Sequence, residues 1–169
     1  MPANQYVIAL GSNRPHFRHG GPRGVIMAAL DRLNDQDLKL RSVSSIIMTP
    51  PIGPSRRTFA NAVALIETSM CPIELLSFLK RLERYFGRRT GRRWGARTLD
   101  LDIIFWSGGI YADKHLTIPH RSFRERTFVL APMVQITAQW RDPVTGLTPR
   151  HLHARLKKPK PVDRRGKPD

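Results

Sequence analysis

Three short apolar runs, each bounded by turn-forming or polar residues, predict strands in the first half of the chain. Residues 6–10 (YVIAL) lead into the turn sequence GSN, and residues 38–48 alternate in character before Pro50 and Pro51. Residues 61–67 (NAVALIE) form the third run. Segments of this length that stop near glycine or proline are typical of strands. We therefore expect three strands here, with the second and third paired as neighbours.

Apolar residues spaced three and four positions apart predict helices between and after these strands. The strongest pattern covers 72–86, where a proline suits the first turn and Gly87 suits the end. Its apolar stripe consists of Leu75, Leu79, Leu82 and Phe86. Weaker patterns predict helices over 24–33 and 128–136. Strands mixed with such helices predict an α/β arrangement of two or three layers, in which helices cover one face of a sheet.

Length and composition indicate a single globular domain without a membrane span. A chain of 169 residues that is 40% hydrophobic is long enough to bury one core. It has no apolar run of about 18 residues and YVIAL leads at once into GSN, so we expect no membrane span, no leader and a cytoplasmic protein. Cys71, the single cysteine, is expected to be a small buried or half-buried side chain.

Charge is the most unusual feature of the composition. The chain has 29 Lys and Arg against 13 Asp and Glu, a formal net charge of +16, which predicts attraction to polyanions. Residues 155–169 (RLKKPKPVDRRGKPD) are basic, rich in proline and poor in apolar side chains. We expect a disordered tail there and one domain over 1–154. The tail either keeps the protein soluble or binds nucleic acid non-specifically.

The segment RTLDLDIIFW (97–106) sets two aspartates into an apolar strand. Side chains alternate across a strand, so Asp100 and Asp102 share one face with their Cα atoms about 6.6 Å apart. Two buried carboxylates this close repel each other unless a cation lies between them. Mg²⁺ fits, because it prefers one or two carboxylates together with water and phosphate oxygens. The alternative is that each aspartate pairs with a nearby arginine.

Six arginines and no acidic residue lie between residues 84 and 97, just before these aspartates. Guanidinium groups beside a metal-binding pair suit phosphoryl transfer, which depends on positioning and on neutralising phosphate charge. Arg93 and Arg97 are placed to face a triphosphate, and Trp94 either stacks on a planar heterocycle or fills core space. The chain has no Walker A sequence and no dinucleotide-binding glycine fingerprint, so a nucleotide needs another binding device.

Several motifs together resemble one known family. They are YVIALGSN, TPPIGP, FANAVALIETS, KRLERYFGR, RRWGARTLDLDIIFW and LTIPHRSFRERTFVLAPMVQI, in order from about Tyr6 to Ile136. This set is similar to the 6-hydroxymethyl-7,8-dihydropterin pyrophosphokinases of folate biosynthesis. The resemblance implies an α+β, ferredoxin-like sandwich with a mostly antiparallel sheet flanked by helices. It also implies transfer of a diphosphoryl group from ATP to the pterin, release of AMP, and two Mg²⁺ ions.

The same resemblance implies roles for individual residues. Asp100 and Asp102 would hold both metal ions, and Arg88 and Arg97 would be catalytic residues that neutralise the triphosphate. The nucleotide side would comprise Glu83, Arg93, Trp94, Ile103, His115, His120, Arg121 and Arg126, and Lys80 also matches a nucleotide-side position. The pterin side would comprise Gly11, Thr49, Pro50, Pro51, Ile52, Phe59, Asn61, Trp94 and Phe128.

Two other functions stay open at the level of the sequence. The net charge favours a basic nucleic-acid-binding module, although the aspartates interrupt the richest basic patch. The same fold could also serve a phosphotransferase that acts on another heterocycle. As a pterin enzyme, the chain is expected to be a monomer whose partners are two small-molecule substrates, with no membrane contact.

Overall fold

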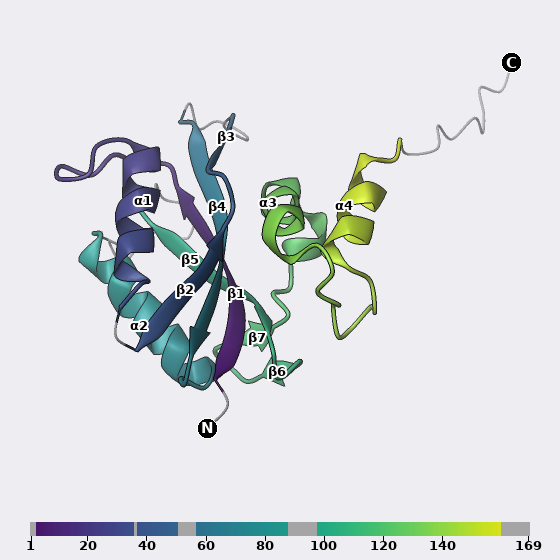
Figure 1. Cartoon of the computed structure of the whole chain (residues 1–169). Coiled ribbons are helices and arrows are strands. Elements are labelled where there is room, and N and C mark those ends of the chain that lie inside the picture. Colours follow the sequence, from purple (N-terminus) through teal and green to yellow (C-terminus); the bar gives the residue numbers. More distant parts are fainter. Residues whose placement is uncertain (1–2, 36, 51–56, 88–97, 160–169) are drawn as a thin grey trace, which may run out of the picture.

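The chain folds around one antiparallel sheet, with helices on both of its faces (Figure 1). The computed structural model describes residues 3–35, 37–50, 57–87 and 98–159. Along the chain its elements are β1 (Asn4–Ser12), α1 (Pro22–Arg32), β2 (Leu38–Val43), β3 (Ile47–Thr49), β4 (Phe59–Thr68), α2 (Pro72–Tyr85), β5 (Asp100–Trp106), β6 (Tyr111–Ala112), β7 (Thr117–Ile118), the 3₁₀ helix η1 (Phe123–Glu125), α3 (Thr127–Thr137) and α4 (Pro149–Lys157).

The main sheet has the strand order β2-β4-β1-β5, and β3 also pairs with β4. The pairings between these described strands are antiparallel. With β3 set aside, the chain runs β1, α1, β2, β4, α2 and β5, which is the β-α-β-β-α-β order of the ferredoxin-like fold. The expected α+β fold with a mostly antiparallel sheet is therefore confirmed.

Each face of the sheet has its own hydrophobic core. On one face, α1 and α2 cover Tyr6, Ile8 and Leu10 of β1. On the other face, α3 packs on β4, and α4 packs on α3, over a core that contains Val7 and Val63. The prediction that helices cover one face is wrong, because β1 and β4 are apolar on both sides. Figure 1 shows α1 and α2 to the left of the sheet and α3 and α4 to its right.

The strand predicted over 38–48 is instead two strands, β2 and β3, and both pair with β4. Ser44 lies in the gap between them. Its backbone N–H donates to the carbonyl of Val63 at 2.9 Å, and the N–H of Val63 donates to Ser44 Oγ at 2.9 Å. A serine side chain that takes a backbone donor in this way interrupts the regular ladder. The expected pairing with 61–67 is confirmed.

The predicted helices over 72–86 and 128–136 are confirmed as α2 and α3, and the helix over 24–33 is confirmed as α1, which starts two residues earlier. Gly87 follows α2 with φ of +90°, the conformation that ends a helix at glycine. The prediction for Cys71 is wrong. It is exposed because it is the N-cap of α2, where its N–H donates to the Glu74 carboxylate at 2.8 Å.

Helix α4 has no counterpart among the sequence predictions. Thr148 caps its first turn by accepting from the N–H of His151, and Leu152 is buried in the core shared with α3. Because α4 continues to Lys157, the prediction of a disordered tail is wrong for residues 155–157, and residues 160–169 lie outside the described residues. Among the described helices, none has the length and apolar character of a membrane span.

Candidate functional site

The strand register brings three predicted site residues into one row across the sheet. Asn61 of β4 pairs with Gly11 of β1, and Gly11 pairs with Asp100 of β5. Directly opposite residues of antiparallel strands have side chains on the same face. Val7, Ala9 and Val63 lie on this face as well, in or against the core beneath α3. An amide and a carboxylate therefore lie two strand spacings apart, about 10 Å, on a surface that α3 borders.

Gly11 leaves space for the amide of Asn61. A Cβ atom at position 11 would lie 3.3 Å from Asn61 Oδ1, tighter than an ordinary contact. Asn61 Nδ2 donates to Thr49 Oγ1 at 3.1 Å, which fixes the orientation of the amide. Thr49 in turn pairs with Phe59 across β3 and β4. The structure thus brings together four of the residues predicted for the pterin side.

Two more residues predicted for the pterin side lie at the margins of this group. Pro50 directly follows β3 and is exposed. Phe128 is half-buried in the first turn of α3, and the guanidinium carbon of Arg126 lies 5.8 Å from the centre of its ring. Because α3 packs on β4 and also contacts β3, the helix of Phe128 lies over the same sheet face as Asn61.

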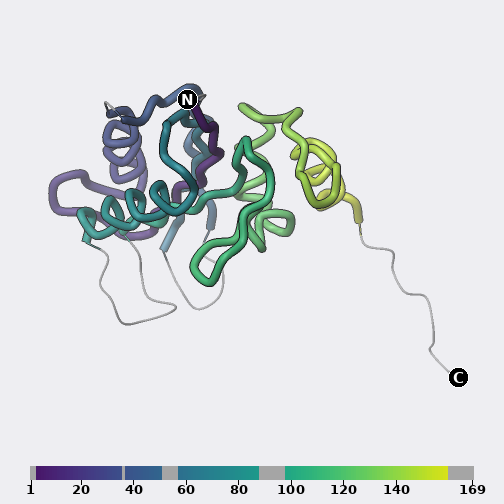
Figure 2. Tube along the Cα trace, turned by 90° about the horizontal axis from the view of Figure 1, so that it is seen from below, coloured from purple at the N-terminus to yellow at the C-terminus, as the bar shows by residue number. Residues whose placement is uncertain are grey.

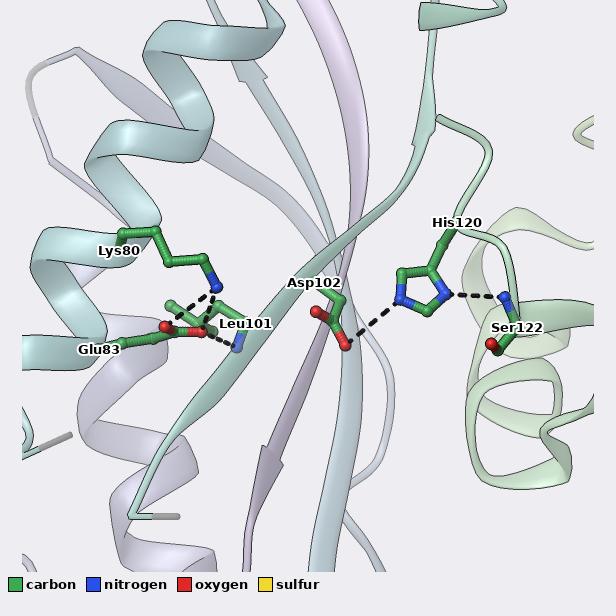
Figure 3. A network of polar contacts seen from close by, with 6 residues as sticks. All are labelled: Lys80, Glu83, Leu101, Asp102, His120 and Ser122. Carbon is green, nitrogen blue, oxygen red and sulfur yellow. Dashed lines mark hydrogen bonds and ion pairs between the residues drawn. The ribbon is translucent and has the colours of Figure 1, made fainter. Parts of the chain in front are cut away.

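Asp102 lies one row farther along, opposite Ala9, and His120 approaches it from the loop after β7 (Figure 3). His120 Nε2 is 3.8 Å from Asp102 Oδ2. The N–H of Ser122 donates to His120 Nδ1 at 3.1 Å, so a neutral ring carries its proton on Nε2, toward the carboxylate. In the described part of the chain, Asp102 pairs with this histidine and with no arginine.

The surroundings of Asp102 disfavour its negative charge. Burial, followed by the charge of Asp100, raises the pKa of Asp102 above its ordinary value, although His120, Lys80 and Arg126 act in the opposite direction. Burial lowers the pKa of His120, against the attraction of the two aspartates. A divalent cation between the carboxylates would relieve the repulsion that raises the pKa of Asp102.

The donor set of the aspartate pair fits a hard cation. Two carboxylates supply oxygen atoms only, as Mg²⁺ prefers. Within the described ranges, no group of three or more His, Cys, Asp and Glu side chains gathers around a common point. An ion held by Asp100 and Asp102 would therefore complete its coordination with water or with oxygen atoms of a bound phosphate.

A cavity of about 500 Å³ opens beside Asp102, between α2 and the segment from residue 113 to residue 126. Its wall includes Asp102 and five residues predicted for the nucleotide side, which are Ile103, His115, His120, Arg121 and Arg126. Lys80 of α2 lies on the opposite wall. The cavity thus combines two carboxylates, those of Asp102 and Asp113, with a larger number of cationic or imidazole groups, which suits a ligand with phosphate groups near a metal ion.

Glu83, also predicted for the nucleotide side, is fully buried behind β5 (Figure 3). Its Oε1 accepts from the N–H of Leu101 at 2.9 Å, and Lys80 Nζ lies 3.2 Å from its carboxylate. Glu83 therefore ties α2 to the strand that carries the aspartates. It also holds the ammonium group of Lys80 at the edge of the cavity.

Several predicted residues lie outside the described residues. They are Arg88, Arg93, Trp94, Arg97, Pro51 and Ile52. Conversely, the cavity wall contains residues that the sequence did not single out, among them Leu76, Asp113, Lys114 and Thr117. Asp113 accepts the N–H groups of His115 and Leu116, both at 2.7 Å, which shapes the turn that carries His115. The sequence does contain a signal for this turn, because an aspartate in a short loop often accepts hydrogen bonds from the backbone N–H groups two and three residues later.

Comparison with known proteins gives consistent matches. A family model described as 7,8-dihydro-6-hydroxymethylpterin-pyrophosphokinase (HPPK) matches residues 7–138. The 2-amino-4-hydroxy-6-hydroxymethyldihydropteridine pyrophosphokinase of Haemophilus influenzae is 40% identical over 133 residues, which cover 78% of this chain and 80% of that protein. The Bacillus subtilis protein of the same name is 37% identical over 134 residues, 78% of this chain and 77% of that one.

A solved structure supports the fold. The crystal structure of wild-type Plasmodium falciparum HPPK-DHPS matches with a TM-score of 0.70 and 14% identity, over 90% of this chain and 41% of that chain. At this identity the likeness concerns the fold alone, and this chain spans less than half of that longer protein. The family model and the two bacterial relatives decide the assignment: the chain belongs to the 7,8-dihydro-6-hydroxymethylpterin-pyrophosphokinase family.

Proposed function

We propose that the chain transfers the terminal diphosphoryl group of ATP to the hydroxymethyl oxygen of 6-hydroxymethyl-7,8-dihydropterin, which yields AMP and the pterin diphosphate for folate biosynthesis. One observation supports this assignment most directly. Asn61, Gly11 and Asp100 lie in one row of the sheet, so a group that reads a heterocycle and a group that binds a metal ion face the same space. Family membership supplies the identity of the two substrates.

The pterin ring binds on the side of β3 and β4. Asn61 presents its Oδ1, since Thr49 already engages its Nδ2, and an amide pairs well with the mixed donors and acceptors at a ring edge. Phe59 and Phe128 supply aromatic surface for stacking. Pro50, Pro51 and Ile52 belong to the pterin side of the proposal as well. Gly11 keeps the floor between the pterin and the aspartates free of a side chain.

ATP binds on the other side of the row, in the cavity beside Asp102. His115, His120, Arg121 and Arg126 contact the nucleotide, and Ile103 lies near the adenine. Arg93 and Trp94 contribute to this side, and Arg88 and Arg97 neutralise charge on the transferred group. Glu83 keeps β5 and Lys80 in place for this binding.

Asp100 and Asp102 hold two Mg²⁺ ions. When bound, such ions neutralise charge on phosphate oxygens and orient the groups that exchange. The chain's own contribution is to keep two carboxylates on one face of a rigid strand, with the Nε2 proton of His120 directed at one of them. The hydroxymethyl oxygen and the triphosphate are thereby brought into one orientation, which lowers the entropic cost of the reaction.

Nucleotide chromatography tests this function. Purified protein is incubated with ATP and Mg²⁺, with and without the hydroxymethyl dihydropterin. We expect AMP and pterin diphosphate in equal amounts only when the pterin is present. Formation of ADP would show single phosphoryl transfer and would exclude the proposed reaction.

The protein works as a cytoplasmic monomer whose partners are these two small molecules. Nucleic acid binds at most non-specifically, through the basic residues at the C-terminal end. Sedimentation at several protein concentrations tests the first point, and a single species of about 19 kDa is expected from the chain mass of 19.3 kDa. A dimer at micromolar concentration would contradict it.

A further inference from the structure

An ion pair with a buried carboxylate attaches the C-terminal part of the chain to η1, whose flanking residues line the nucleotide cavity. Asp142 lies between α3 and α4 with its side chain fully buried, and Arg124 lies in η1. Arg124 Nε donates to Asp142 Oδ2 at 2.7 Å, and Nη2 donates to Oδ1 at 2.9 Å. Two parallel bonds of this kind fix the relative orientation of the two groups.

Asp142 is itself held rigidly. The Thr145 hydroxyl donates to Oδ2 at 2.7 Å, and the Val144 N–H donates to Oδ1 at 3.0 Å. The backbone of Asp142 bonds to Leu147 and Gly146 at 2.9 and 2.8 Å, which closes the turn. A buried carboxylate that is satisfied by donors from several directions has one stable position. It is therefore a fixed anchor for Arg124.

The 3₁₀ helix η1 has a second anchor on the side of the sheet. Phe123 is fully buried, and its ring meets Phe105 of β5 edge-on at 5.1 Å. Trp140 stacks on the same Phe105 at 5.8 Å, and the Arg124 guanidinium lies 4.7 Å from the Phe123 ring centre. Thus η1 is held between β5 and the segment that leads to α4. Figure 2 shows α4 at the edge of the molecule, at the end opposite to α1.

The residues on either side of η1 reach the cavity. Ser122 and Arg126 both line it, and Ser122 orients His120 through the bond to Nδ1. The Arg126 N–H donates to the carbonyl of Phe123 at 3.2 Å, so Arg126 moves with η1. Asp142 does not line the cavity. It also lies beyond residue 138, where the family match ends.

We propose that the Asp142–Arg124 pair positions the nucleotide side of the active site, because it fixes η1 and, through η1, His120 and Arg126. Asp142 and Arg124 are positioning residues that do not touch the substrates. This inference rests on the proposed function for its kinetic consequence. A displacement of about 1 Å at a reacting group can cost about 100-fold in rate, so a small movement of η1 is sufficient for a measurable effect.

Asp142→Asn in the full chain tests the inference, because asparagine keeps the size of the side chain and removes its charge. We expect the KM for ATP to rise about ten-fold and the KM for the pterin to rise about two-fold at most, since Asn61 and Thr49 lie on β4 and β3 and, of the described pterin-side residues, Phe128 alone adjoins η1. Arg124→Gln should give the same pattern, and the double variant should be no worse than either single one. A purely structural role would reduce the amount of active enzyme and lower kcat, with both KM values unchanged.

Arg41→Gln is the matched control. It breaks the Arg41–Glu67 pair, which is also bidentate, at 3.0 and 2.8 Å. Glu67 lies six residues from Asn61 along β4, about 20 Å at the rise of a strand. Both KM values should match those of the wild type. If Asp142→Asn does not fold, Thr145→Val replaces it, because it removes a single hydroxyl bond to Asp142 and should raise the KM for ATP about three-fold.

Calorimetric binding of an unhydrolysable ATP analogue with Mg²⁺ separates this inference from the proposed reaction. A wild-type protein that binds the analogue but forms no pterin diphosphate would overturn the reaction only. In that case the binding measurement still tests the positioning role of the Asp142–Arg124 pair, because the Asp142→Asn variant should bind the analogue about ten-fold more weakly than the wild type. Folded Asp142→Asn and Arg124→Gln proteins with unchanged analogue affinity, or with unchanged KM for ATP, would overturn the positioning role.

Discussion

The negative charge of Asp102 is unfavourable in the folded protein. Burial and the neighbouring Asp100 raise its pKa, so its neutral form is favoured more in the folded protein than in the unfolded one. Such a group contributes stability below its unfolded pKa, and this contribution is lost as the pH rises through the folded pKa. Ionisation of Asp102 therefore destabilises the metal-free fold, which is expected of a functional carboxylate.

Asp102→Asn should therefore separate function from stability. Turnover should fall by about 100-fold or more, since a carboxylate that holds the metal ions is lost. The melting temperature of the metal-free protein at pH 7 should be equal to or higher than that of the wild type, because the penalty of a buried charge is gone. Steady-state assays and thermal unfolding by circular dichroism measure the two effects. A variant that unfolds at room temperature would instead assign Asp102 to a structural ion pair.

Gly11→Ala should disturb the pterin side alone. The added Cβ would come within 3.3 Å of Asn61 Oδ1, so the amide must shift. We expect the KM for the pterin to rise about ten-fold, with the KM for ATP within about two-fold. Comparison with Asn61→Ala and with the double variant is the control, because the double variant should lose no more than Asn61→Ala does. Additive losses would mean that Gly11 acts independently of Asn61.

The local sequence was sufficient to predict the placement of some of these site residues and insufficient for others. The alternation of LDLDI placed both aspartates on one face, as observed. The row of Asn61, Gly11 and Asp100 depends on the register between strands that are far apart in the chain, which no local pattern encodes. Arginine and aspartate are residue types that are mostly exposed in proteins, so nothing in the local sequence indicates that Asp142 is buried against Arg124.

At the scale of elements, hydrophobic periodicity located α2 and α3 to within one residue. It did not separate β2 from β3, because the interruption comes from a Ser44 side chain that bonds to the backbone of β4. It also did not reveal α4, which has only Pro149 and Leu152 buried and is otherwise mostly basic. A short helix with so small an apolar face depends on its tertiary contacts with α3 and η1.

The stabilisation that the Asp142–Arg124 pair gives to the C-terminal part of the fold should depend on pH. Burial alone would raise the pKa of Asp142, but hydrogen bonds from Arg124, Thr145 and Val144 lower it below its ordinary value. The ionised Asp142 therefore stabilises the fold above about pH 3.9, and this contribution is lost as the pH falls further. The difference in unfolding free energy between wild type and Asp142→Asn should shrink from about pH 5 to about pH 3 in urea titrations. A difference that is constant over this range would contradict the lowered pKa.

At the scale of the whole molecule, the net charge of +16 does not define the function. The resemblance of the motifs to a known family predicted the ferredoxin-like fold, whereas apolar periodicity alone predicted helices on a single face. The second face of the sheet is covered because the chain after β7 leads α3 back onto β4. This path places Phe128 over β4 and η1 beside the cavity. Excess positive charge then favours the approach of anionic ATP.

Removal of residues 160–169 should leave catalysis intact. This segment contains four basic and two acidic residues and lies beyond α4. We expect kcat/KM for both substrates to stay within about two-fold, while non-specific binding to DNA weakens and becomes less dependent on salt. Fluorescence anisotropy over a series of salt concentrations measures the second effect. A large loss of activity would assign the segment a role in the active site.

The most direct test of the central claim is a crystal structure of the protein with Mn²⁺, an unhydrolysable ATP analogue and the hydroxymethyl dihydropterin. Anomalous scattering locates the ions independently of the protein density. We expect ions bound to Asp100 and Asp102, the triphosphate beside His120 and Arg126, and the pterin edge on Asn61. Carboxylates turned toward neighbouring arginines, with the ions and the nucleotide bound elsewhere, would contradict the account.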